Sequence, residues 1–152
     1  MTTLQIELVQ SSFEAVKPIA EIAADLFYTR LFELDPALRA MFRTDRTEQG
    51  RKLMHMIGVA VKGLSRPEQI LPAVEELGRR HACYGVRDEH YETVGAALLW
   101  TLEKGLCEAF TPNVRAAWTA VYTLLTETMQ RAAAGATTQD LAAERATGAV
   151  YV

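Results

Sequence analysis

One histidine stands in line with apolar residues in a segment that has the period of an α-helix. The apolar residues four, seven and eleven positions before His81 are Leu77, Val74 and Ile70. This spacing places all of these side chains on one face of a helix. Gly85 can end the helix by adopting a positive φ, and Asp88 can cap the start of the next helix. A polar, titratable ring is therefore expected on a buried face.

A histidine on an apolar face has two interpretations. It can be a core residue whose ring nitrogens form hydrogen bonds, or it can be a metal ligand. The face of His81 carries no Cys, Asp or Glu nearby, so it cannot supply the three or four protein ligands of a zinc site. An iron porphyrin brings four nitrogens of its own and needs only one protein nitrogen. The residues around His81 leave both interpretations open.

Length and composition limit the possible classes of protein. The chain has 152 residues, enough for a single domain with a sizeable core. Its net charge of −3 does not favour a nucleic-acid or membrane partner. The sequence shows no secretory signal and no apolar run of about 18 residues that could span a bilayer. Cys83 and Cys107 fit a reducing compartment, so a cytoplasmic location is expected.

The apolar residues recur at intervals of three and four along the chain, and no segment alternates as a strand does. We therefore expect an all-α fold. Leu4 and Ile22 are assigned to the buried faces of the first two helices. The expected helices span about 4–17, 19–34, 36–42, 53–64, 71–83, 88–109 and 112–129, with residues 43–49 as a loop. Residues 1–134 form the expected domain, and 135–152 a flexible tail with a short helix at 138–145.

The helix over residues 53–64 carries a clean amphipathic pattern that begins at Leu53. One turn further back, the same face holds Gln49 and Gly50, an amide side chain and a residue without a side chain. His55 is about 200° from Leu53 around the helix axis and is expected to face solvent. The pattern thus predicts that Gln49 and Leu53 point inward and that His55 points outward.

Five segments in this order and spacing resemble the globins, specifically the single-domain bacterial globins and the haem domain of flavohaemoglobins. LGRRHACYGV followed by HYETVG is similar to their proximal-histidine segment, and AAWTAVY to their last helix. The resemblance covers about residues 4–129 and implies a globin fold of seven to eight helices around a haem pocket. It implies that His81 is the iron ligand, with Val86 and Tyr91 beside the cofactor.

The three remaining segments resemble the opposite side of a globin pocket. RAMF is similar to the corner phenylalanine that packs on the haem, which gives this role to Phe42. LFYTRLF implies a distal tyrosine at Tyr28. EQGRKLM implies a distal position for Gln49, with Leu53 one turn later on the ligand side and against the cofactor.

The resemblance implies haem b, the iron complex of protoporphyrin IX, bound without covalent attachment because no C-x-x-C-H motif is present. The second ring nitrogen of His81 is expected to donate to the carbonyl of Leu77, one turn earlier. Gly50 is expected to let its helix approach the ring closely. Three cations, Lys52, Arg79 and Arg80, are either partners of the haem propionates or solvated surface charges.

Two functions are compatible with these residues. The first is reversible binding of dioxygen, NO or CO, for oxygen transport, storage or sensing, with Tyr28 and Gln49 as hydrogen-bond donors. The second is a nitric oxide dioxygenase, for which a separate reductase is expected, because these 152 residues are not expected to include a flavin or nicotinamide domain. Flavohaemoglobins resemble one another in a proximal glutamate whose position here is Ala133, and Glu127 lies nearly two turns earlier. These features favour binding over a self-sufficient enzyme.

A third possibility is a globin fold that binds no haem and serves as an interaction module. The presence of His81 argues against it. The sequence leaves open whether the protein is a monomer or a homodimer.

Overall fold

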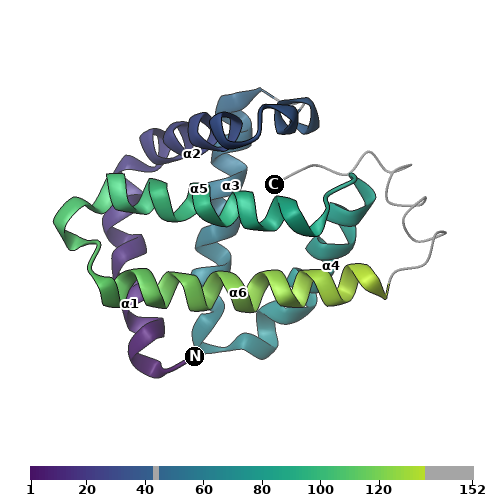
Figure 1. Ribbon diagram of the computed structural model, residues 1–152. Helices are drawn as coiled ribbons and strands as arrows, with labels where there is room; N and C mark the ends of the chain where they lie inside the picture. The colour runs from purple at the N-terminus through teal and green to yellow at the C-terminus, as the bar shows by residue number, and fades with distance from the viewer. Residues whose placement is uncertain (43–44, 136–152) are drawn as a thin grey trace.

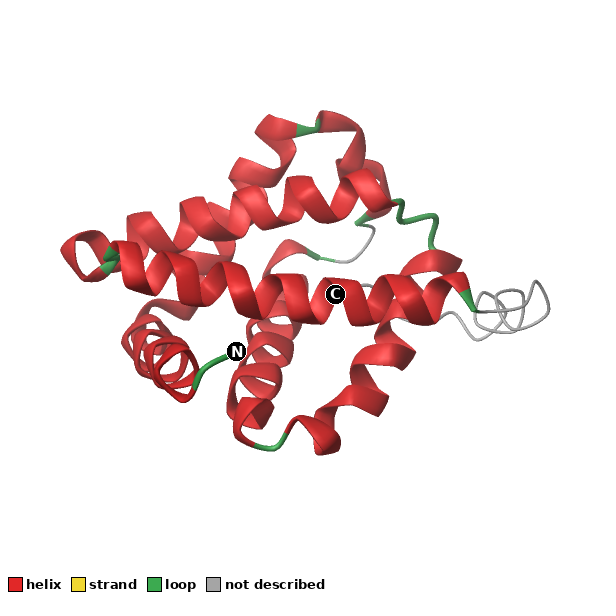
Figure 2. Ribbon diagram, turned by 60° about the horizontal axis from the view of Figure 1, so that its bottom comes forward, coloured by secondary structure: helices red, strands yellow, loops and turns green. Residues whose placement is uncertain are grey.

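The computed structural model describes residues 1–42 and 45–135. The expected all-α fold is confirmed: every regular element in these ranges is a helix (Figure 2). The α-helices are α1 (Thr3–Val16), α2 (Ala20–Leu34), α3 (Arg46–Lys62), α4 (Pro67–Cys83), α5 (Asp88–Leu106) and α6 (Pro112–Ala134). Short 3₁₀ segments span Lys17–Ile19, Pro36–Met41, Gly63–Ser65 and Cys107–Ala109. The helical turn expected at 36–42 is one of these, so the described ranges hold six α-helices rather than seven.

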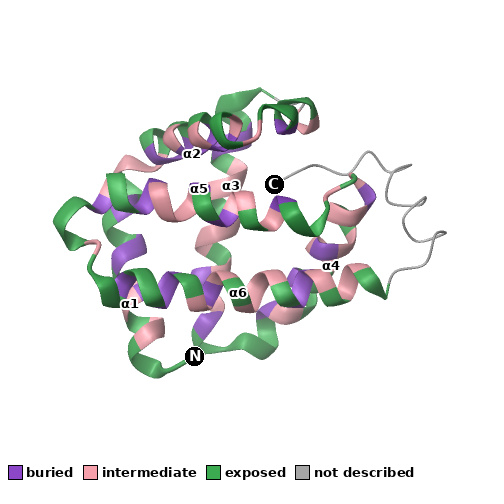
Figure 3. Ribbon diagram, viewed as in Figure 1, coloured by how far each residue is buried: buried purple, intermediate pink, exposed green. Residues whose placement is uncertain are grey.

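The helices cross one another around a common core. Figure 1 shows α5 and α6 side by side across the front, with α2 along the far side of α5 and α3 crossing behind. Helices α1 and α4 pack on opposite ends of α6, and α2 packs on both α3 and α5. Each helix turns its buried residues toward the middle of this arrangement (Figure 3). None of the helices in the described ranges is long and apolar enough to cross a membrane.

Two hydrophobic clusters form the core. The first joins α1, α2, α3, α5 and α6 around Trp118, which is 2% exposed. The second joins α2 to the 3₁₀ segment Pro36–Met41 and to α5, and it contains Tyr28 and Leu31. The space that remains for a ligand is bordered by α2, α3, α4, α5 and α6.

Two helix caps and one glycine turn are formed as the sequence predicts. The side chain of Asp35 accepts a hydrogen bond from the N–H of Ala37 at 3.2 Å, and Thr111 caps α6 through the N–H of Val114 at 3.2 Å. Gly85 has a φ of +85° after α4, a conformation that a residue with a Cβ adopts only at a cost. The corner between α4 and α5 is therefore short and sharply defined.

The starts of α3 and α4 differ from the predictions. Residues 46–49, expected in a loop, form the first turn of α3, because Asp45 caps this helix through the N–H of Glu48 at 3.2 Å. Helix α4 begins at Pro67 rather than near Leu71 and contains Pro72. Pro67 suits the first position of the helix. At Pro72, the packing of α4 on α6 outweighs the preference of the preceding residue for extended backbone.

Helix α5 also differs from the prediction at both ends. Its N-cap is Arg87 and not Asp88, which is already helical, and the helix ends at Leu106 with a 3₁₀ turn beyond it. Leu4 and Ile22, expected to be buried, are 62% and 61% exposed. The short helix expected at residues 138–145 and the expected tail lie outside the described residues, apart from residue 135.

Candidate functional site

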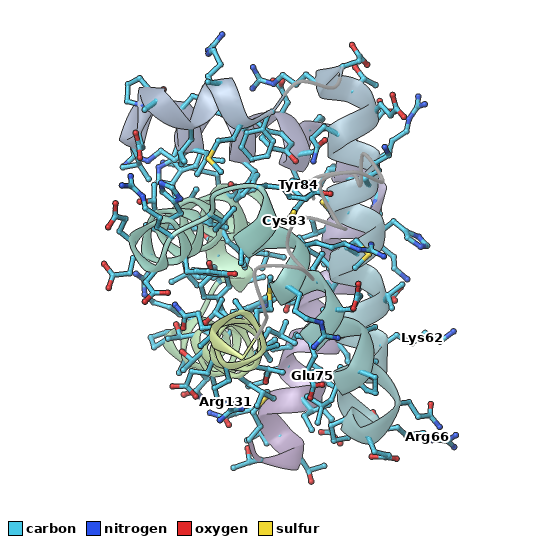
Figure 4. All side chains as sticks on the ribbon, turned by 90° about the vertical axis from the view of Figure 1, so that its right-hand side faces the viewer. Lys62, Arg66, Glu75, Cys83, Tyr84 and Arg131 are labelled. Carbon is cyan, nitrogen blue, oxygen red and sulfur yellow. The ribbon has the colours of Figure 1, made fainter. Side chains whose placement is uncertain are left out.

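A cavity of about 220 Å³ lies between α2, α3, α4, α5 and α6. Its walls are almost entirely apolar. Six residues that the sequence singled out line it: Tyr28, Phe42, Leu53, His81, Val86 and Tyr91. Figure 4 shows the end of α4 from the side, with Cys83 and Tyr84 directed between the helices, and Tyr84 also lines the cavity. The fold thus brings one histidine and several aromatic side chains to a common apolar space.

The orientation of His81 is set by its own helix. Its Nδ1 lies 2.8 Å from the carbonyl oxygen of Leu77, as predicted. Because a carbonyl oxygen only accepts, Nδ1 carries the proton and Nε2 keeps the lone pair in the neutral ring. The N–H of Val86 donates to the carbonyl of His81 at 3.0 Å, and the Tyr91 ring lies over the imidazole at 6.3 Å between centroids. The ring is therefore held on the chain in one tautomer.

Tyr28 is the polar group of α2 at the cavity, and it is 2% exposed. The rings of Phe27, Phe32 and Phe42 surround it, with centroids 5.1, 6.1 and 5.4 Å from its own. Burial raises the pKa of Tyr28 to about 12, although its hydrogen bond with Gln49 and the charge of Arg46 act in the opposite direction. Tyr28 therefore keeps its proton at neutral pH and is available as a hydrogen-bond donor.

Gln49 points inward, as its helical position predicts, and is 2% exposed. It is nevertheless not among the residues that line the cavity. Its backbone carbonyl accepts a hydrogen bond from the hydroxyl of Tyr28 at 3.4 Å, a length at the weak end of the range. His55, predicted to face solvent, is exposed.

The expected role of Gly50 is wrong. A Cβ at this position would lie 2.9 Å from the Cβ of Ala24, so Gly50 allows α3 to approach α2 and not a ligand in the cavity. The two helices cross closely there. Periodicity correctly placed Gly50 on a buried face, but a helix of this fold has buried surface on more than one side.

The cations that the sequence suggested for haem propionates do not line the cavity. Lys52 pairs with Glu48 at 3.3 Å on α3. Arg79 and Arg80 pair with Glu76 at 2.9 and 3.7 Å on α4. Each pair lies within one helix turn and is partly exposed, so these contacts are worth little. To bind a carboxylate of a ligand, Lys52 would have to leave Glu48 and Arg80 would have to leave Glu76.

Helix α5 contributes His90, Val94 and Leu98 to the cavity wall, and these residues stand at intervals of four and share one face. The apolar period predicts that Val94 and Leu98 face inward, which the structure confirms, whereas no role was expected for His90. His90 is 7% exposed, and its Nδ1 accepts the N–H of Arg87 at 3.0 Å. The fourfold spacing of His90 with Val94 and Leu98 could have indicated its inward position, since His90 is the first residue of the HYETVG segment.

The donor set limits which cofactor could fit. No group of three or more His, Cys, Asp or Glu side chains suited to a bare metal ion occurs within residues 1–42 and 45–135. The cavity instead offers one oriented imidazole in an apolar space. This combination fits a planar apolar macrocycle that carries a metal with four of its own ligands.

Comparison with known proteins agrees with the architecture. The Globin family model matches residues 25–129. A Flavohemoprotein of Vibrio cholerae is 29% identical over 130 residues, which cover 84% of this chain and 33% of the relative. A Flavohemoprotein of Bordetella parapertussis is 32% identical over 118 residues, which cover 76% of this chain and 29% of the relative. The chain thus spans about a third of the length of these curated relatives.

Solved structures show the same fold. A bacterial globin from Campylobacter jejuni superposes with a TM-score of 0.77 at 24% identity, covering 88% of this chain and 96% of its own. An engineered carbene transferase, a proposed nitric oxide dioxygenase from Rhodothermus marinus, gives a TM-score of 0.79 at 22% identity, with 88% and 94% covered. Since the family model matches more than half of the chain, this protein belongs to the globin family.

Proposed function

We propose that this chain is a haem-binding globin that reversibly binds dioxygen, and also NO and CO, at a five-coordinate iron. The observation that carries the proposal is His81 at the cavity wall, with Nδ1 held by the Leu77 carbonyl at 2.8 Å. This bond leaves the lone pair on Nε2, the atom a metal would use. Haem b, bound without a covalent link, would supply an iron with one open position for a diatomic ligand.

The remaining wall residues would exclude water and support the macrocycle. Phe42 and Leu53 lie on the side of Tyr28, and Val86 and Tyr91 lie on the side of His81. An apolar wall matters because burying a large apolar ring stabilises the complex in proportion to the area removed from water. It also keeps bulk water, and so protons, away from the ligand.

Tyr28 would act as the hydrogen-bond donor for the ligand. Its pKa of about 12 keeps the phenol protonated, and its present bond to the Gln49 carbonyl is long at 3.4 Å. Tyr28 also interacts with the side chain of Gln49, so a polar ligand would have to compete with Gln49 for the Tyr28 hydroxyl. The amide of Gln49 is proposed as a second donor, although Leu53 and not Gln49 lines the cavity.

The names of the relatives favour a second candidate function. Two of them are Flavohemoproteins, and one structural neighbour is described as a proposed nitric oxide dioxygenase, so nitric oxide dioxygenation with a separate reductase is the second candidate. The proximal glutamate expected from the resemblance falls at the half-buried Ala133, and Glu127 is exposed on α6. The described residues supply no carboxylate at that position, which favours ligand binding over oxidation chemistry.

Absorption spectra test the proposal directly. The purified protein would be measured as isolated, after reduction, and after reduction with CO. A high-spin reduced form whose Soret band shifts with CO is expected for an open coordination position. No Soret band after addition of haem would refute the proposal, and a low-spin reduced form would reveal a sixth protein ligand.

A steady-state assay of NO consumption separates the two functions. It would use an added ferredoxin or flavodoxin reductase under air. Binding alone predicts consumption that stops after one equivalent of NO per haem, whereas a dioxygenase would turn over for as long as reductant remains.

A further inference from the structure

His90 is the second histidine at the cavity wall, and none of the roles described above uses it. It lies in the first turn of α5 and is 7% exposed. Val94 and Leu98, on the same face of α5, line the cavity with it. A polar ring in this position needs a hydrogen-bond partner for each nitrogen, because an unpaired polar group in an apolar space costs free energy.

One ring nitrogen of His90 already has a defined role. Its Nδ1 lies 3.0 Å from the backbone nitrogen of Arg87 and accepts that N–H. The His90 ring thus satisfies the N–H of the N-cap residue Arg87, one of the N–H groups that have no partner within the helix. A nitrogen that accepts carries no proton, and in a neutral imidazole the proton is then on the other nitrogen. Nε2 of His90 is therefore a donor.

The structure records no acceptor for this donor among the described residues. Two tyrosines at the wall already donate to backbone carbonyls: Tyr122 to the carbonyl of Tyr91, and Tyr28 to the carbonyl of Gln49. A ligand that fills the cavity should thus bring an acceptor to Nε2 of His90.

We propose that Nε2–H of His90 donates a hydrogen bond to a carboxylate of the bound porphyrin. This proposal rests on the proposed function, because it assigns the contact that orients the same cofactor. Protoporphyrin is apolar except for two carboxylates, and a carboxylate is the acceptor that matches an N–H donor best.

The pairing of the surface cations supports this assignment. Lys52 pairs with Glu48 at 3.3 Å, and Arg80 pairs with Glu76 at 3.7 Å. Neither cation lines the cavity. His90 lines it already and is held in place by the Arg87 N–H. A donor that is oriented before binding loses little conformational entropy on binding.

The experiment compares two porphyrins and three substitutions. His90→Asn keeps an oxygen for the Arg87 N–H and an N–H donor, His90→Asp keeps the oxygen without the donor, and His90→Leu keeps neither. Each protein would be loaded with haem or with haem dimethyl ester, which lacks the carboxylates. The rate of porphyrin loss to an excess of an apoglobin acceptor would then be measured. The exposed His55, changed to Asn and Asp, serves as the matched control.

We expect haem to leave His90→Asp and His90→Leu about tenfold faster or more than the unsubstituted protein, and His90→Asn to lie near the unsubstituted protein. With the dimethyl ester, the unsubstituted protein and His90→Leu should lose porphyrin at equal rates. Equal acceleration by His90→Leu for haem and for the ester would overturn the proposal and leave His90 as a helix cap alone.

Two further measurements keep the outcome clear. Far-ultraviolet circular dichroism of the apoproteins would show whether His90→Leu unfolds, in which case the comparison of His90→Asn with His90→Asp decides. A long-range ¹⁵N–¹H spectrum should show the Nε2-protonated tautomer of His90, and the other tautomer would contradict the proposal. If the unsubstituted protein binds neither porphyrin, the proposed function itself fails. Faster loss of haem from the His90 variants alone would leave the proposed function intact, so the two outcomes can be distinguished.

Discussion

The ring of Tyr91 lies over the ring of His81, with 6.3 Å between the centroids and 23° between the planes. Nδ1 of the same imidazole donates to the Leu77 carbonyl at 2.8 Å. Tyr91 is itself fixed, because the hydroxyl of Tyr122 on α6 donates to its backbone carbonyl. Residues of three helices, α4, α5 and α6, therefore define the space that the His81 ring occupies.

The first prediction concerns removal of this ring. His81→Ala should purify without haem and should regain it when imidazole is added, because imidazole can occupy the space between Tyr91 and the Leu77 carbonyl. The measurement is the Soret absorbance per protein, with and without imidazole. His55→Ala, on the exposed side of α3, is the control and should keep its haem. Normal haem content and an unchanged spectrum in His81→Ala would place the ligand elsewhere.

The second prediction concerns the hydroxyl of Tyr28. Tyr28→Phe should raise the dissociation rate of dioxygen about tenfold or more, because a hydrogen bond to a charged acceptor is worth about 1.5–3 kcal/mol. Stopped-flow release of dioxygen measures this rate. Gln49→Leu should have a smaller effect, since Gln49 does not line the cavity. An unchanged rate in Tyr28→Phe would remove the tyrosine from the mechanism.

The third prediction concerns alkaline pH. Burial raises the pKa of Tyr28 and Tyr91 from 10.0 to about 12, with the Asp88 charge adding to the shift of Tyr91, and burial also raises the pKa of Tyr122. Folding thus favours the neutral phenols. This contribution to stability is complete below pH 10, the ordinary pKa of tyrosine, and is lost as pH rises through about 12.

Two measurements check that stability falls as the pH rises above 10. The thermal midpoint of unfolding should fall between pH 10 and 12, and the phenolate absorbance should appear later in the folded than in the denatured protein. Coincident titration of the folded and denatured protein would contradict the burial of these phenols.

The fourth prediction concerns the contact between the first and last helices. The indole Nε1 of Trp118 donates to Oγ of Ser12 at 2.8 Å in the buried core. Ser12→Ala should lower the free energy of unfolding by about 1–3 kcal/mol, because the indole N–H would lose its acceptor. Ser11→Ala is the matched control: Ser11 is exposed and bonds only its own helix at 3.3 Å. Equal effects of the two substitutions in urea unfolding would disprove the importance of this contact.

The sequence alone determined the fold class and the inner face of the principal helices. A helix repeats every 3.6 residues, so the spacing of apolar residues states which side chains share a face. This is why His81 with Leu77, the inward Gln49 and the outward His55 could all be predicted. The positive φ of Gly85 and the caps at Asp35 and Thr111 were equally predictable, since each depends on residues within one turn.

Only the tertiary structure decided what each buried face meets. Gly50 is inward, but it contacts Ala24 of α2 and not the cavity. The His90 ring serves as the cap of α5 while lining the cavity, and the surroundings of Tyr28 come from α2 and Phe42. Periodicity reports the direction of a side chain relative to its own helix axis. The neighbour in that direction depends on how the helices cross, and that is set by packing between residues far apart in the chain.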